Sequence, residues 1–351
     1  MILKKATYYL LLIILFVGGS LHAQEEYIVN HSKFMQKSNP SYFGFNSLNK
    51  VGVLYNSMKL NEYDRLDNKY FFGALTFEDQ GFSLGVDINS FKIQTTGLTS
   101  NLANLSYIYK LQFDNNTFFL PAVTIGFGSS SVNPANLIFE DQLDTSTGFI
   151  NSESIDPLAP IISNVNYFDL GASFILHSDK YMAGLSFKHL NRPNTSYNKE
   201  VPFEKPIQVS LQGAYEFDLN PYERRFLPRY SYLYAYGSFT KYGDALQIYL
   251  SQDFQLGEFS IGLSQQAASL NSFSLNNVGV SIGLAVENFD FGILYNFPFQ
   301  SPGIVYSPSI FELFITLTLV FIAEISVVNT TVYKSITTTR HQLQQPIIIN
   351  F

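Results

Sequence analysis

The sequence contains no cysteine and no tryptophan, and charged residues make up only 14% of its 351 positions. Without cysteine, the chain can form no disulfide and can carry no lipid on a thiol. A soluble domain usually has about 25% charged residues, so the low charge favours a membrane environment. The formal net charge of −7 argues against nucleic acid as a partner.

Long apolar runs are also missing beyond the first two dozen residues. The mean hydropathy is only +0.07, which is too low for a bundle of membrane-spanning helices. Aromatic residues nevertheless reach 16%, with 33 phenylalanines and 23 tyrosines. Abundant apolar surface without long apolar runs is typical of strands that cross a membrane.

The one long apolar run lies at the start of the chain. Two lysines precede an apolar stretch at 10–17, and Ala23 supplies a small residue after it. This pattern predicts a secretory signal peptide at 1–23, cleaved before Gln24. An uncleaved anchor helix is the alternative that the same residues leave open.

After Gln24 the chain shows no helical periodicity, but apolar and polar residues alternate repeatedly. A period of two indicates strands with two different faces. Several of these strands are long enough to cross a bilayer at a tilt, which favours a barrel over a soluble β-sandwich. The predicted strands are 50–58, 69–78, 81–91, 101–113, 116–128, 166–177, 180–190, 206–219, 229–241, 244–255, 257–267, 275–287, 289–297 and 309–321. The fold class is therefore predicted as all-β, a transmembrane antiparallel β-barrel of about 14 strands.

The connections between these strands differ in length on the two sides of the membrane. If the first strand starts in the periplasm, the periplasmic turns are tight, and the longer connections lie outside. The tight turns are 79–80, 114–115, 178–179, 256 and 288; the long connections are 59–68, 92–100, 129–165, 191–205, 268–274 and 298–308. Two connections depart from this rule, a long inner one at 220–228 and a short outer one at 242–243.

Each strand is expected to present one face to lipid and one to the lumen. On the last strand the lipid-facing residues are expected to be Phe311, Leu313, Ile315, Leu317, Leu319 and Phe321. Glu312 and Thr316 would face the lumen, and Lys188, Asp87 and Glu312 would belong to a charge network that fills it. Aromatic clusters at 70–72, 118–119 and 230–236 are expected at strand ends, as membrane-interface girdles.

No catalytic constellation stands out, so we expect no catalytic residue, no metal site and no cofactor. His177 and His189 fall on separate predicted strands without metal-ligand spacing. The loop at 129–165 contains five candidate partner-binding carboxylates: Glu140, Asp141, Asp144, Glu153 and Asp156. A solvated acidic loop is the alternative for this set, because the carboxylates lack the order of a calcium-binding loop. The charged run at 223–225 either docks a periplasmic partner or is an ordinary charged turn.

One short motif precedes the first strand. Asn39-Pro40-Ser41-Tyr42-Phe43-Gly44 resembles the N-P-A-Y-A-G stretch of the PorP/SprF family of Bacteroidetes outer-membrane proteins, with Asn39, Pro40, Tyr42 and Gly44 as the matching positions. Ser41 replaces the usual alanine, and Phe43 replaces a small residue. The likeness continues in order through the strands at 81–93, 104–109, 181–193 and 309–321, and it covers most of 34–321.

The resemblance implies a role in type IX secretion. Its members accompany a secreted partner, often an adhesin with a C-terminal sorting domain, and some are needed for gliding motility. Other type IX secretion or periplasmic components are expected partners as well. The alternative is a FadL-like channel for hydrophobic small molecules, which also has fourteen strands and an Asn-Pro motif in an N-terminal segment. The implied organisation is a signal peptide at 1–23, a periplasmic or plug segment at 24–49, an outer-membrane barrel at 50–321 and an extension of unknown role at 322–351.

Overall fold

The computed structural model describes most of the region between residues 30 and 319. The described residues are 30–47, 49–59, 64–133, 136, 140–143, 154, 164–197, 201–222, 226–269, 273–298 and 309–319. The predicted signal peptide at 1–23 and the extension at 322–351 lie outside them. Within the described part of the chain, no helix is both long and apolar enough to cross a membrane.

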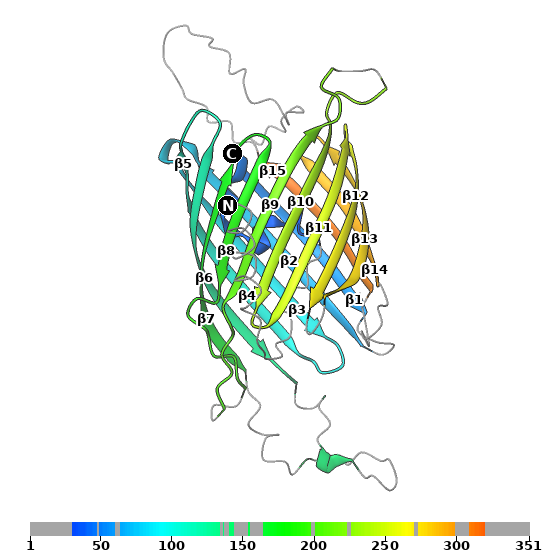
Figure 1. Ribbon diagram of the computed structural model, residues 1–351. Coiled ribbons are helices and arrows are strands. Elements are labelled where there is room, and N and C mark those ends of the chain that lie inside the picture. Colours follow the sequence, from blue (N-terminus) through cyan, green and yellow to red (C-terminus); the bar gives the residue numbers. More distant parts are fainter. Residues whose placement is uncertain are drawn as a thin grey trace, which may run out of the picture.

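Fourteen long antiparallel strands close into a barrel, as the alternation predicted (Figure 1). Each strand pairs with its neighbours in sequence, β15 pairs with β1, and β4 pairs with β6. The strands are β1 (Asn49–Lys59), β2 (Arg65–Phe77), β3 (Phe82–Ile93), β4 (Thr99–Tyr109), β6 (Phe118–Ser131), β7 (Val165–His177), β8 (Tyr181–Lys188), β9 (Gln208–Asp218), β10 (Ser231–Tyr242), β11 (Ala245–Leu256), β12 (Phe259–Ser269), β13 (Phe273–Val286), β14 (Phe289–Pro298) and β15 (Ser309–Leu319). Among the described strands the sheet closes on itself, so none of these fourteen is an edge strand, as a membrane-spanning sheet requires.

Several predicted boundaries were wrong by a few residues. The strand predicted at 101–113 ends at Tyr109, and a separate two-residue strand, β5 (Leu111–Gln112), pairs with the start of β6. The turns predicted at residues 256 and 288 alone are the pairs 257–258 and 287–288. A two-residue hairpin needs positive φ angles, which Gly257 (64°) and Glu287 (53°) provide.

The two ends of the barrel differ in their connections, so we name them the turn end and the loop end. At the turn end, the connections are 78–81, 110–117, 178–180, 219–230, 257–258 and 287–288. At the loop end they are 60–64, 94–98, 132–164, 189–207, 243–244, 270–272 and 299–308. The two predicted exceptions are confirmed, since 219–230 is long and 243–244 is short. The connection predicted as long at 268–274 was wrong, because it has only the three residues 270–272. Both β1 and β15 meet the turn end.

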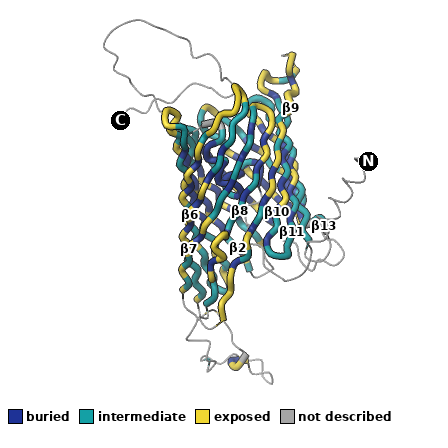
Figure 2. Tube along the Cα trace, turned by 60° about the vertical axis from the view of Figure 1, so that its left-hand side comes forward, coloured by how far each residue is buried: buried dark blue, intermediate teal, exposed yellow. Residues whose placement is uncertain are grey.

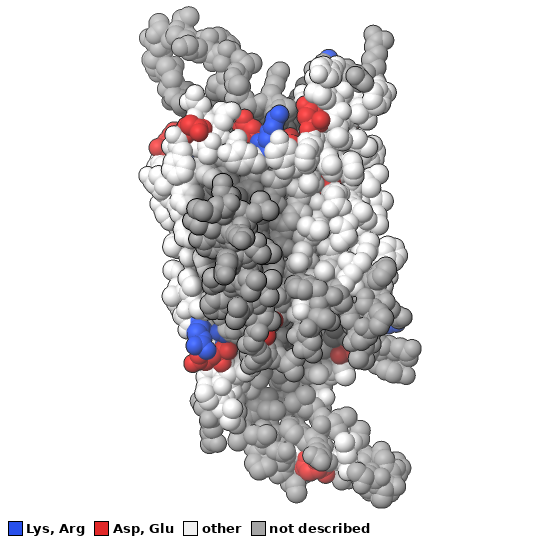
Figure 3. Space-filling model, in the orientation of Figure 1, with Lys and Arg blue, Asp and Glu red and all other residues white. Residues whose placement is uncertain are grey.

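The outward face of the wall is apolar along the strands. On β15, Phe311 and Leu313 are exposed, whereas Glu312 between them is completely buried. The exposure pattern alternates along much of most long strands (Figure 2). On the face that Figure 3 shows, the described charged side chains gather near the two ends, with uncharged surface between them. The predicted lipid face is therefore confirmed on β15 from Phe311 to Leu317. Leu319 and its neighbour Thr318 are both half-buried, and Phe321 lies outside the described residues.

The predicted aromatic girdles were partly wrong. Tyr70 and Phe72 in the middle of β2 are 1% and 4% exposed and face the lumen, while Phe71 between them is 43% exposed. Tyr236 on β10 is also buried. Alternation sends every second residue of an aromatic run inward, and in this barrel those rings have an apolar partner inside.

Candidate functional site

A segment from the N-terminal part of the chain lies inside the barrel. We call residues 30–47 the plug; it comprises the short helix α2 (Met35–Ser38) and the 3-10 helix η1 (Pro40–Ser47) (Figure 1). The Asn39 side chain accepts a hydrogen bond from the Ser41 N–H at 3.1 Å, as a helix N-cap does. Pro40 then starts η1, where its missing N–H costs nothing. The motif that resembled the family thus shapes the turn in the plug.

Polar contacts fasten the plug to β7 and, through the Ser186 hydroxyl that donates to the Ser38 carbonyl at 2.7 Å, to β8. The Asn39 amide donates to the Phe174 carbonyl at 3.2 Å. The hydroxyls of Ser41 and Ser173 are 2.8 Å apart. Ser41 is one of the two positions where the motif departs from the family pattern, and its hydroxyl pairs with a serine of the barrel wall.

The plug is also fastened to the opposite wall. The Glu312 carboxylate on β15 accepts the Asn30 N–H at 3.0 Å and the amide of Asn56 on β1 at 2.7 Å. Lys33 forms an ion pair with Asp290 on β14 at 3.5 Å. Because β14, β15 and β1 lie across the barrel from β7 and β8 in the strand order, the plug is held from two sides.

Apolar side chains of the plug complete the core of the lumen. The Phe34 ring packs edge-on against Tyr70, Phe72 and Phe314, with centroids 6.1, 6.0 and 5.3 Å away. The Phe43 ring lies where a side chain at position 85 would be, directly over Gly85 on β3. Phe43 is the second position that departs from the family pattern. Its ring fits against the wall because Gly85 has no side chain there.

The plug separates two cavities in the lumen. The turn-end cavity has a volume of about 240 Å³ and is lined by Lys33, Asp253 and Asp290 among others. The loop-end cavity has a volume of about 70 Å³ and lies between the plug and β3, β4 and β6 to β9. Its charged and titratable lining residues are Lys37, Asp87, Asp169, Lys188, His189 and Lys205.

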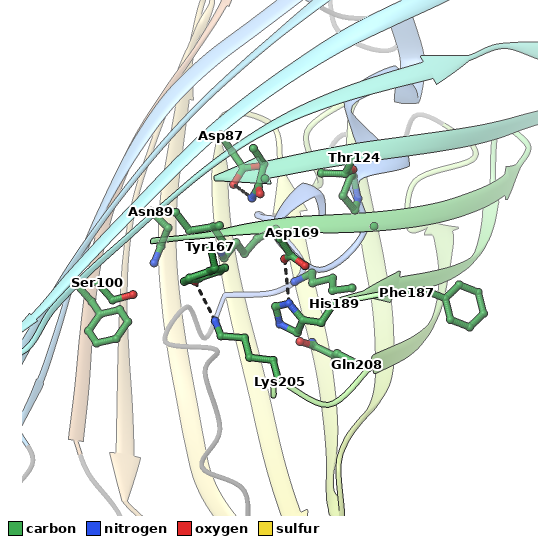
Figure 4. A pocket seen from close by; sticks show the side chains of 18 residues that line it. Asp87, Asn89, Ser100, Thr124, Tyr167, Asp169, Phe187, His189, Lys205 and Gln208 are labelled. Atoms are coloured by element: carbon green, nitrogen blue, oxygen red, sulfur yellow. Dashed lines mark hydrogen bonds and ion pairs between the residues drawn. The ribbon is translucent and has the colours of Figure 1, made fainter. Parts of the chain in front are cut away.

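Buried and partly buried polar pairs shape the loop-end cavity, as Figure 4 shows. Nδ1 of His189 lies 2.9 Å from Oδ2 of Asp169. The Lys205 ammonium donates to the Tyr167 hydroxyl at 2.9 Å. Asp87 on β3 accepts from the Asn104 amide of β4 at 3.0 Å. These contacts hold charged groups from several strands and from the connection before β9 around one space.

The predicted charge network is divided between two places. Asp87 and Lys188 both line the loop-end cavity, whereas Glu312 binds the plug and Asn56 instead. Asp169, Lys205 and Ser173 carry contacts that the sequence analysis did not single out. For Asp169 and Ser173, the only signal in the sequence was that alternation on β7 directs both side chains inward. For Lys205 there was no signal in the sequence.

The five predicted partner-binding carboxylates are only partly placed. Glu140 and Asp141 belong to the 3-10 turn η4 (Glu140–Gln142), and Asp141 accepts from the Ser154 hydroxyl at 2.8 and 3.0 Å. Asp144, Glu153 and Asp156 lie outside the described residues, as does the charged run at 223–225. Among the residues that are described, no three His, Asp or Glu side chains are arranged to hold a metal ion.

Solved structures similar to this chain are membrane barrels. The TodX monoaromatic hydrocarbon channel, as its deltaS2 mutant, matches with 11% identity over 80% of this chain and 92% of its own, at a TM-score of 0.48. The COG4313 outer membrane channel from Pseudomonas putida F1 matches with 13% identity over 79% and 98%, at 0.40. Omp33 of Acinetobacter baumannii matches with 9% identity over 78% and 100%, at 0.41.

No curated protein sequence matches the chain. A family model described as type IX secretion system membrane protein PorP/SprF matches residues 23–317. The match includes the whole plug and nearly all of the barrel. The chain therefore belongs to the PorP/SprF family of type IX secretion system membrane proteins, as its motifs indicated.

Proposed function

We propose that this protein is a plugged outer-membrane barrel that binds one secreted, adhesin-like polypeptide with a C-terminal sorting domain and performs no chemistry. Binding would serve export of the partner or its attachment to the cell surface, and gliding motility where the partner is a motility adhesin. The observation that carries the proposal is the plug, which is fastened to opposite walls by Ser41–Ser173 and Asn30–Glu312. Membership of the type IX secretion family supports it.

The plug favours a scaffold over a channel for a physical reason. A pore for hydrophobic molecules needs a path through the lumen, and here the plug adds Phe34 and Phe43 to a core shared with the wall. Opening that path would expose apolar rings and leave the buried Glu312 carboxylate without contacts that it makes now. A surface that binds a partner needs no such opening.

The orientation is part of the proposal. Long loops of membrane barrels face the exterior and short turns the periplasm, so the loop end would be outside the cell and the turn end would meet periplasmic secretion components. Because the chain has no cysteine, a Ser154→Cys variant carries one thiol. A membrane-impermeant maleimide should label it on intact cells; labelling only after the outer membrane is broken would reverse the orientation.

The functional test is deletion of the gene, followed by surface proteomics. We expect one adhesin-like protein to disappear from the cell surface while other type IX substrates remain. Removing most of 132–164 should lose the same partner, while the barrel still shows heat-modifiable mobility on gels. If the deletion strain displays its adhesins normally but loses uptake of a hydrophobic compound, the FadL-like alternative replaces this proposal.

A further inference from the structure

We propose that the loop-end cavity binds a carboxylate carried by an extended segment of the secreted polypeptide. The carboxylate is either an acidic side chain or a chain terminus. The identity of the ligand as a secreted polypeptide rests on the proposed function. The preference of the cavity for a carboxylate is argued only from the residues that line it.

The charge of the lining favours an anion. Three lysines line the cavity, from the plug (Lys37), the end of β8 (Lys188) and the connection before β9 (Lys205), against two aspartates. The charges of Lys37 and Lys188 both act on Asp87. Three lysines against two aspartates therefore give the lining an excess positive charge, in a largely buried site where water screens it little.

Two buried acceptors indicate that the ligand also brings hydrogen-bond donors. Oδ1 of Asn89 and Oδ1 of Asp169 contact no donor among the described residues, although the two residues are only 8% and 7% exposed. A buried acceptor without a donor costs about 1–3 kcal/mol. A polypeptide segment supplies both requirements, because its backbone N–H groups are donors and its carboxylate is an acceptor. An anion without hydrogen-bond donors, such as chloride or sulfate, would satisfy neither acceptor.

The size and position of the cavity limit what enters it. A volume of about 70 Å³ has room for a short side chain or a few waters, not for a folded domain. Phe91 and Tyr167 add aromatic surface for an aliphatic stem. Phe91 and Tyr167 are both near the loop ends of their strands, so the cavity is reached from the side that we propose faces outward.

Carbodiimide coupling on the purified full-length barrel tests the site directly. The reagent adds to a carboxylate, the nearest lysine amine attacks the activated acyl carbon, and an amide forms as the urea leaves. One probe is an acetylated and amidated pentapeptide with a single glutamate; a second has no acidic side chain but a free C-terminal carboxylate. Mass spectrometry locates each adduct. We expect about ten-fold more adduct at Lys188 or Lys205 than at Lys92, an exposed lysine at the same end.

Competition and substitution provide the controls. An excess of unlabelled glutamate peptide should suppress the adduct, and the matched glutamine peptide should not. The probe that couples identifies the source of the carboxylate. Lys188→Gln and Lys205→Gln should each lower capture of the secreted partner on cells about ten-fold, and Lys92→Gln should leave it unchanged. Lys205 is buried, so Lys205→Gln could prevent folding, which the heat-modifiable gel mobility would reveal. Lys188 is only half-buried, so Lys188→Gln still tests the proposal in that case.

The outcomes separate the two proposals. Equal coupling at Lys92 and at the cavity lysines would overturn the inference. So would partner capture that does not change in Lys188→Gln, and the proposed function would then survive. If coupling to the purified barrel is selective for the cavity lysines but the deletion strain displays its adhesins normally, the site is supported and the proposed function is rejected.

Discussion

The two faces of the barrel wall are built from alternate residues of the same strands, yet they follow different rules. Outward positions such as Ile282 and Leu313 need only to be apolar, because they meet fluid lipid. Inward positions such as Gly85, Ser173 and Glu312 are each matched to one feature of the plug. The outer face therefore tolerates exchange within a class of residues, and the inner face does not.

The largest effect should come from charge on the lipid face. Ile282 is 62% exposed on the outward face of β13. Ile282→Arg should lower the free energy of unfolding by about 2–4 kcal/mol, because a charge at the bilayer midplane loses its hydration. Denaturant titration of the barrel in lipid vesicles measures it. Ile282→Leu is the control, and an arginine variant as stable as the leucine variant would mean that this face does not meet lipid.

On the lumen face, removing the Glu312 carboxylate should release one side of the plug. Glu312→Leu takes away the acceptor that holds the Asn30 N–H and the Asn56 amide. The expected loss is about 1–3 kcal/mol of unfolding free energy. Single-channel recording in planar bilayers should show openings that the wild type lacks. Leu313→Ala, next in sequence but facing lipid, should remain closed; if both variants conduct alike, Glu312 does not hold the plug.

The same glycine-to-valine substitution on each face of the wall allows a direct comparison. A side chain at Gly85 would overlap the Phe43 ring, whereas one at the outward Gly73 would lie an ordinary 3.7 Å from Val51. Gly85→Val should cost about 1–3 kcal/mol through overpacking, and Gly73→Val should cost little. Phe43→Ala should partly rescue Gly85→Val in the same denaturant assay. A double variant that is no more stable than Gly85→Val would contradict this packing.

The smallest effect is expected at the Ser41–Ser173 contact. Ser41→Ala restores the residue typical of the family and removes one buried hydroxyl pair. The loss should be about 1 kcal/mol. A double-mutant cycle with Ser173→Ala measures the coupling: the double variant should lose less than the sum of the single variants. Additive losses would show that the two hydroxyls act independently.

The sequence predicted the wall well because lipid and lumen impose a period of two. The fourteen strands, the antiparallel order and the lipid face of β15 followed from alternation and connection length. Boundaries were less accurate where pairing decided them, as at β5 and at the Gly257 turn. The inward direction of Tyr70 and Phe72 was missed because an aromatic run appears the same whether its partner is lipid or a plug.

Composition and alternation by themselves determined that this chain forms a membrane barrel, and its motifs indicated the family. Only the tertiary structure decided what occupies the lumen. The contacts Ser41–Ser173, Phe43–Gly85 and Asn30–Glu312 join residues 42 to 282 positions apart in the sequence, and periodicity carries no information on such pairs. The loop-end cavity arises in the same way, because barrel closure brings β3, β7 and the connection before β9 around the plug, and their charges meet only there.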